Sequence, residues 1–229
     1  MVEYEFDKEK CWYKLVCKKY NTRDCNLSCI RYMEIFYLMV NSNIPKKRQI
    51  KISLTPDDCD KANFDTLKSI KEDIDNFVNK GNNLLIYSNT AGNGKTSWAF
   101  KLMTSYFDKI WLGNCFRVRG VYYLMSDLFE LLVSQFDKKH EDSQDKIELL
   151  KTCDLVIFDD IASTKFSDYR AEKLFAIIES RLNNGKSCIF TSNLSSNELG
   201  QVMDKRLVSR IWNESIIIEF KGKDKRGMN

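Results

Sequence analysis

The fold of this chain of 229 residues is decided by the apolar run LLIYS at residues 84–88 and by the loop that follows it: Asn89, Thr90, Ala91, Gly92, Asn93, Gly94, Lys95, Thr96 and Ser97. The run is typical of a buried strand, and the spacing of apolar residues from Thr96 to Trp111 predicts a helix. Two glycines allow the backbone to curl, and the amides that open a helix attract anions. The stretch therefore predicts a phosphate-binding loop.

The loop matches the Walker A pattern of ATP-binding proteins with one departure, because Asn89 stands where the pattern has its first glycine. Asn is the non-glycine residue that most readily adopts positive φ, so the change is chemically mild. Lys95 is expected to contact the β and γ phosphates, and the Thr96 hydroxyl to hold magnesium. The alternative is a surface turn that contains this sequence by chance. The strand predicted before the loop and the helix predicted after it argue against that alternative.

A second motif is the apolar run LVIF at residues 155–158, which is followed by Asp159 and Asp160. In a parallel sheet, ligands bind at the edge where strands end. Asp159 is placed to hold the magnesium ion, and Asp160 to accept a proton from the attacking water or to orient it. Adjacent carboxylates also occur at solvated loop starts, but the Walker A loop upstream favours the functional interpretation.

Short apolar runs and helical patterns alternate along the chain. Strands are expected at 83–88, 121–125, 155–158, 187–191 and 216–220, with helices at 65–79, 96–111, 127–136, 145–151, 167–182 and 196–203. This alternation, with continuously apolar strands, predicts an α/β fold with a parallel five-stranded sheet covered by helices on both faces.

Composition and charge exclude several classes of protein. A formal net charge of +4 is too small to indicate nucleic-acid binding. The longest apolar stretch, residues 32–40, is far shorter than a membrane span, and acidic residues occupy the positions where a signal peptide would be basic and then apolar. We therefore expect a soluble intracellular protein without structural disulfides.

The N-terminal part contains four closely spaced cysteines, Cys11, Cys17, Cys25 and Cys29. Four thiolates suffice for a tetrahedral zinc site, although this spacing is looser than in common zinc ribbons, and independent buried thiols are the alternative. The only histidine, His140, is expected to be exposed. A helix over 30–40 and a basic connector follow the cysteines, so we predict a Cys-rich module at 1–55 and an ATPase domain at 56–229.

With both Walker motifs, the chain resembles the AAA+ ATPases, and more narrowly the DnaC/IstB-like group of helicase loaders and transposition helpers. Three further stretches support the likeness, which spans residues 65–226: IFTSN at 189–193, RLVSRI at 206–211 and EFKGKDKR at 219–226. The resemblance implies a sensor 1 role for Asn193, an arginine finger at Arg210, with Arg206 as the alternative, and a sensor 2 role for Arg226. For the two helical arginines, weak surface ion pairs are the competing explanation.

The resemblance also implies a function. It predicts magnesium-dependent hydrolysis of ATP to ADP and phosphate, self-association through the ATPase domain, and no full lid domain. It further predicts delivery of a replicative helicase, gripped by the N-terminal module, onto single-stranded DNA in the cytoplasm, or the host cytoplasm if the protein is phage-encoded. An IstB-like transposition helper is one alternative. A nucleotide-gated adaptor with little turnover is another, suggested by Asn89 and by Asp160 in place of the longer Glu of many relatives.

Overall fold

The computed structural model describes residues 7–110, 116–134, 141–161 and 167–225. A single five-stranded sheet runs through the described part of the chain, with strands β1 (Asn83–Tyr87), β2 (Gly120–Leu124), β3 (Leu155–Asp159), β4 (Ser187–Ser192) and β5 (Ser215–Glu219). The strands lie in the order β2-β3-β4-β1-β5, and every neighbouring pair is parallel. This confirms the predicted sheet, with each strand within one residue of its expected bounds.

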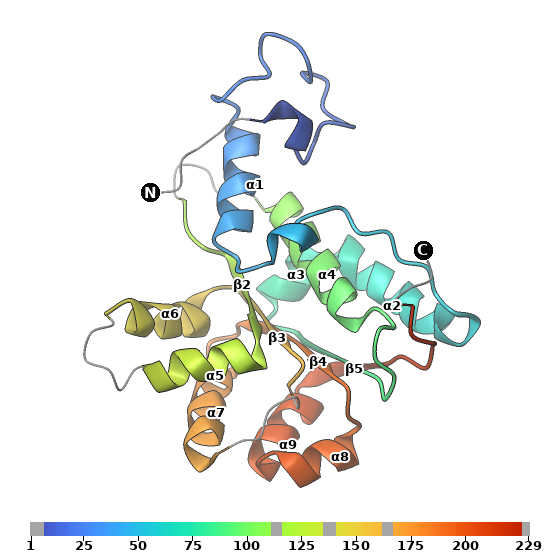
Figure 1. The fold of residues 1–229 in the computed structure, drawn as a ribbon, viewed down its shortest axis with the longest axis vertical. Coiled ribbons are helices and arrows are strands. Elements are labelled where there is room, and N and C mark those ends of the chain that lie inside the picture. The colour runs from blue at the N-terminus through green and yellow to red at the C-terminus, as the bar shows by residue number, and fades with distance from the viewer. Residues whose placement is uncertain (1–6, 111–115, 135–140, 162–166, 226–229) are drawn as a thin grey trace.

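Helices cover both faces of the sheet (Figure 1). On one face lie α1 (Ile30–Val40), α2 (Lys61–Glu72), α3 (Ile74–Asn79) and α4 (Lys95–Lys109). On the other lie α5 (Met125–Ser134), α6 (Glu141–Thr152), α7 (Asp168–Asn183), α8 (Ser196–Val202) and α9 (Lys205–Asn213). Short 3₁₀ helices occur at η1 (Lys8–Lys10), η2 (Lys46–Arg48) and η3 (Asp58–Asp60).

The two faces of the central strands are equally apolar because alternate side chains enter two separate cores. In β1, Leu84 and Ile86 belong to the core under α1–α4, whereas Leu85 belongs to the core under α5–α9. In β3, Ile157 belongs to the core under α1–α4 and Phe158 to the core under α5–α9. A strand buried on both faces has no polar alternation, which is why these runs are continuously apolar in sequence.

The helix predicted over 65–79 is two helices, and this prediction was wrong in its continuity. The break lies at Asp73, whose φ of −118° and ψ of 33° are not helical. The Asp73 side chain accepts a hydrogen bond from the Asn76 amide at 3.3 Å. Short polar side chains that bond locally in this way compete with the helical backbone, which favours a helix boundary here.

Helix α1 shares its core with the sheet. Its residues Ile35, Leu38 and Met39 lie in the same buried cluster as β1 and α4. Arg31 donates to the backbone carbonyl of Ile110 at 2.8 Å, just after α4 ends. Residues 7–29 extend beyond α1, at the top of Figure 1. The division of the chain at residue 55 stays a prediction.

After β5 the chain turns back across the sheet edge. The Asp60 carboxylate accepts hydrogen bonds from the backbone amides of Lys221 and Gly222 at 2.8 and 2.9 Å. The Lys225 amide donates to the Gly92 carbonyl at 3.1 Å, so this tail reaches the predicted phosphate loop. Within the described residues, no helical lid follows β5. None of the helices described is both long and apolar enough to cross a membrane.

Candidate active site

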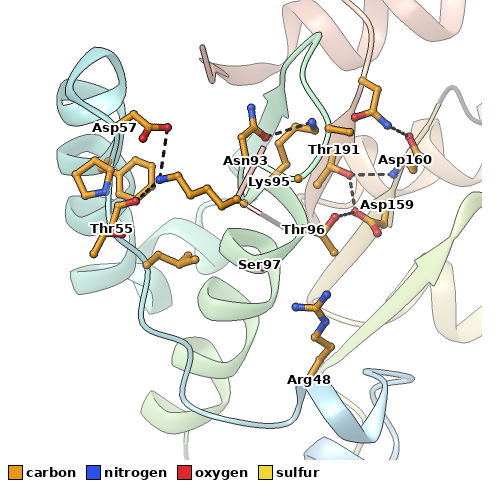
Figure 2. Close-up of a pocket in the computed structure, with 18 of the residues that line it drawn as sticks. Arg48, Thr55, Asp57, Asn93, Lys95, Thr96, Ser97, Asp159, Asp160 and Thr191 are labelled. Atoms are coloured by element: carbon orange, nitrogen blue, oxygen red, sulfur yellow. Dashed lines mark hydrogen bonds and ion pairs between the residues drawn. The ribbon is translucent and has the colours of Figure 1, made fainter. Parts of the chain in front are cut away.

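The carboxyl ends of β1, β3 and β4 meet at one edge of the sheet, where a cavity of about 780 Å³ opens. Its walls are the loop after β1, the ends of β3 and β4, residues 53–57 and the tail near Lys225 (Figure 2). Ligands bind at this edge in parallel α/β sheets. The structure therefore places both Walker motifs on one cavity.

The loop after β1 has the backbone that phosphate binding requires. Gly92 and Gly94 adopt left-handed φ values of 72° and 102°, which only glycine adopts at low cost. Gly94 caps α4 without a side-chain hydrogen bond, so the first amides of the helix remain directed at the cavity. Asn89 is not among the described residues with positive φ. The backbone at this position therefore does not need the left-handed conformation that favours glycine.

Lys95 lies at the base of the loop and is only 7% exposed. Its ammonium donates to the Thr90 carbonyl at 2.9 Å and to the Asn93 side-chain oxygen at 3.4 Å. The Asn93 amide in turn donates to the Ser88 hydroxyl at 2.6 Å. These neutral oxygens hold the ammonium beside the helix N-terminus, where phosphate oxygens would be stronger, charged acceptors.

Thr96 and Asp159 form the part of the site that fits magnesium. The Thr96 hydroxyl donates to a carboxylate oxygen of Asp159 at 2.8 Å, and Asp159 is 5% exposed at the end of β3. Magnesium prefers oxygen ligands and, in ATPases, takes one or two from the protein and others from phosphates and water. Among the described residues, no three His, Cys, Asp or Glu side chains are placed so that they could hold a metal ion by themselves.

Two hydroxyl groups that no sequence motif had indicated also bind Asp159. Thr191 donates to the same Asp159 oxygen at 2.5 Å and accepts the Asp160 amide at 2.9 Å. Tyr122 donates to the other oxygen at 3.0 Å. Burial raises the pKa of Tyr122, and the charge of Asp159 raises it further, so the phenol stays a donor. Thr191 is a polar residue inside the apolar run before Asn193, so the sequence alone could have indicated it as a site residue. The contact of Tyr122 depends on β2 lying beside β3, which the sequence does not show.

Asp160 and Asn193 directly follow the neighbouring strands β3 and β4, and both lie at the cavity. The Asn193 amide donates to an Asp160 carboxylate oxygen at 2.8 Å. Asp160 has a φ of 56°, an uncommon conformation for a residue other than glycine. Such strained residues gather at functional sites, where the surrounding structure holds them in place. The catalytic roles of both residues stay predictions.

The predicted arginine finger lies away from the cavity. Arg210 is on α9, and its guanidinium forms an ion pair with Glu179 on α7 at 2.9 Å. Arg206 pairs with Asp204 at 3.0 Å and lies 5.2 Å from the Phe175 ring centre. The side chain of Arg210 is therefore held on the surface, where a finger that acts on a neighbouring subunit would have to be.

The predicted sensor 2 residue, Arg226, lies outside the described residues. The lysine before it, Lys225, lines the cavity. Its ammonium donates to the Thr55 carbonyl at 2.6 Å, lies 3.5 Å from the Asp57 carboxylate and 5.9 Å from the centre of the Phe64 ring. The tail thus supplies one cation to the site, next to the position that the sequence indicated.

The four N-terminal cysteines line a second, smaller cavity of about 90 Å³. All are free thiols of intermediate burial. Burial raises the pKa of the Cys11 thiol, and the other three cysteines raise it further, although a backbone hydrogen bond opposes them. The side chains thus face one space, but the described residues include no group of three that is arranged to hold a metal. Zinc stays a prediction.

Comparison with known proteins agrees with this geometry. The sequence matches the family described as IstB-like ATP binding protein over residues 39–227. The crystal structure of the DnaC helicase loader has a TM-score of 0.62 and 24% identity, over 73% of this chain and 93% of that one. The crystal structure of DnaI has a TM-score of 0.61 and 17% identity, over 78% and 95%.

AMPPCP-bound DnaA from Aquifex aeolicus has a TM-score of 0.60 and 20% identity, over 73% of this chain but only 48% of DnaA. At these identities the structural likeness shows a shared fold. No curated protein matches the chain. The family match covers most of the sequence and both Walker motifs, and the fold, shared with the DnaC helicase loader, agrees with it, so the chain belongs to the family of IstB-like ATP-binding proteins.

Proposed function

We propose that this protein is a helicase loader that binds and hydrolyses ATP with magnesium and delivers a replicative helicase onto single-stranded DNA. The observation that carries the proposal is the meeting of Lys95, the Thr96–Asp159 pair and the Asp160–Asn193 pair around one cavity. Phosphate binding, metal binding and water activation need these three sets of groups within a few ångströms of one another.

In this proposal each residue has one task. The amides that open α4 and the Lys95 ammonium bind the β and γ phosphates. Thr96 and Asp159 hold magnesium, which neutralises the phosphate charge when it is bound. Asp160 takes the proton of the attacking water, and the Asn193 amide keeps the carboxylate in position. Thr191 and Tyr122 orient Asp159 through its two oxygens.

The loader role has its support in the fold and in the N-terminal segment. DnaC, whose structure is similar, is described as a helicase loader. Residues 7–29 carry exposed apolar side chains, among them Leu15 at 83% exposure, which suit contact with a partner. We propose that this segment grips the helicase, that the protein binds single-stranded DNA, and that it acts in the cytoplasm, or in the host cytoplasm if it is phage-encoded.

The second candidate function is a transposition helper that directs a transposase, which the IstB-like family match favours. The two candidates share the ATPase and differ in the partner. Affinity purification of the tagged chain with ATP should recover a replicative helicase. Recovery of a transposase instead would contradict the loader proposal and support the helper.

A structural zinc ion is the remaining cofactor proposal. We expect about one zinc per purified chain, because four thiolates that face one cavity gain coordination energy and lose their mutual repulsion on binding metal. Cys25→Ser should lower the metal content and make residues 7–29 sensitive to protease. Cys59→Ser, a change at an exposed cysteine of η3, is the matched control and should keep the metal. A Cys25→Ser protein with unchanged fold and zinc would contradict the proposal.

A further inference from the structure

The connector, which is the segment of residues 41–51 after α1, lies beside the nucleotide cavity and is bound to the sheet and to α1. The Ser42 carbonyl accepts the backbone amide of Tyr122 at 2.7 Å, which ties the connector to the edge strand β2. The side-chain amide of Gln49 donates to the carbonyls of Met39 and Ile44 at 3.2 and 2.8 Å, which closes the segment into a bracket. Ser42 and Ile44 are buried. The turn η2 inside this bracket is therefore held in a defined place.

Arg48 is the last residue of η2, and its side chain lines the nucleotide cavity. Figure 2 shows the guanidinium pointing from the connector towards Thr96 and Asp159. Within the described part of the chain, it makes no hydrogen bond or ion pair.

The charges of the side chains that line the cavity indicate a role for Arg48. The cavity lining contains three cationic side chains, Arg48, Lys95 and Lys225, and three carboxylates, Asp57, Asp159 and Asp160. Lys225 is paired with Asp57, and the Lys95 ammonium already has acceptors in the loop. Without Arg48 the side chains of the lining would carry a net negative charge, which would weaken the binding of a triphosphate at the N-terminus of α4.

We propose that Arg48 is a phosphate-binding residue of the ATP site, supplied by the connector, and that bound ATP therefore adds a further restraint on the connector. The inference rests on the proposed nucleotide binding and adds a contact from outside the Walker and sensor motifs. A guanidinium has five donors in a planar fork that matches phosphate oxygens. Because the bracket joins Arg48 to α1, the contact would report the phosphate state of the site to the N-terminal segment.

Equilibrium binding of ATP and of ADP, each with magnesium, to the full chain tests this contact. Arg48→Ala should weaken ATP binding about tenfold, the effect of one lost charge-assisted hydrogen bond, and ADP binding less. Arg48→Lys should retain part of the affinity because it keeps the charge. Lys47→Ala removes a neighbouring exposed cation that does not line the cavity, and should bind ATP like the wild type.

A second readout follows the connector directly. ATP should slow tryptic cleavage after Lys46 and Lys47 in the wild type, and should not slow it in Arg48→Ala at saturating ATP. Wild-type binding in Arg48→Ala, or an equal loss in Lys47→Ala, would overturn the inference and leave the proposed function intact. A wild-type protein that binds no ATP would overturn the proposed function itself. Arg48→Gln repeats the test if the alanine variant fails to fold.

Discussion

Replacing Asp160 with Asn is expected to lower the rate of ATP hydrolysis by about 10²–10⁴-fold while ATP binding is retained. The amide has the shape of the carboxylate but cannot accept the proton of the attacking water, and general-base catalysis typically contributes this much. The φ of 56° at this position is tolerated by Asn, so the fold should persist. Steady-state hydrolysis with single-stranded DNA present, together with ATP affinity, measures both effects.

Asp127→Asn is the matched control for this variant. Asp127 is exposed in the first turn of α5 and lies outside the cavity lining, so its replacement removes the same charge but no group that lines the cavity. We expect wild-type hydrolysis there. If the wild-type rate stays at background and Asp160→Asn changes nothing, the enzyme proposal is wrong, and the nucleotide-gated adaptor becomes the better description.

Replacing Arg210 with Ala is expected to reduce hydrolysis by the assembled protein by about 10³-fold, the lower end of the effect of an arginine finger. The reason is that a cation from the neighbouring subunit would no longer stabilise charge on the transferred phosphate. The ion pair between Arg210 and Glu179 is partly exposed, and such pairs are worth only ~0.2–1 kcal/mol. Arg210 can therefore leave Glu179 at little cost when subunits assemble.

A mixture of two inactive variants tests whether this arginine acts in trans. In an equal mixture of Arg210→Ala and Asp160→Asn chains, roughly one interface in four joins an intact Asp160 to an intact Arg210. Activity should therefore return in the mixture, well above that of either variant alone. Arg206→Ala, four residues earlier on α9, serves as the control and should retain hydrolysis. A mixture as inactive as its components, with Arg206→Ala equally inactive, would contradict the assignment.

The strands were predictable because a doubly covered parallel sheet requires runs of apolar residues, and these runs are visible without any tertiary information. Helix boundaries were less accurate where a local interaction decides them. At the break, the Asp73 carboxylate accepts a hydrogen bond from the side-chain amide of Asn76. The apolar residues on both sides of Asp73 keep helical spacing, so the sequence gives no strong sign that the helix ends there. The sequence also did not predict that α1 packs into the core it shares with the sheet. An apolar helix face does not specify which apolar surface it packs against.

The sequence by itself determined the phosphate loop and the two carboxylates, because the chemistry of phosphate and magnesium demands particular residues at fixed local spacing. It also determined that Asp160 and Asn193 end buried strands. Only the tertiary structure decided which distant groups complete the site. Tyr122 reaches Asp159 because β2 lies beside β3, and Arg48 reaches the cavity because the connector is bound to that edge strand. Contacts of this kind depend on strand order and chain path, which long-range packing sets and local spacing does not encode.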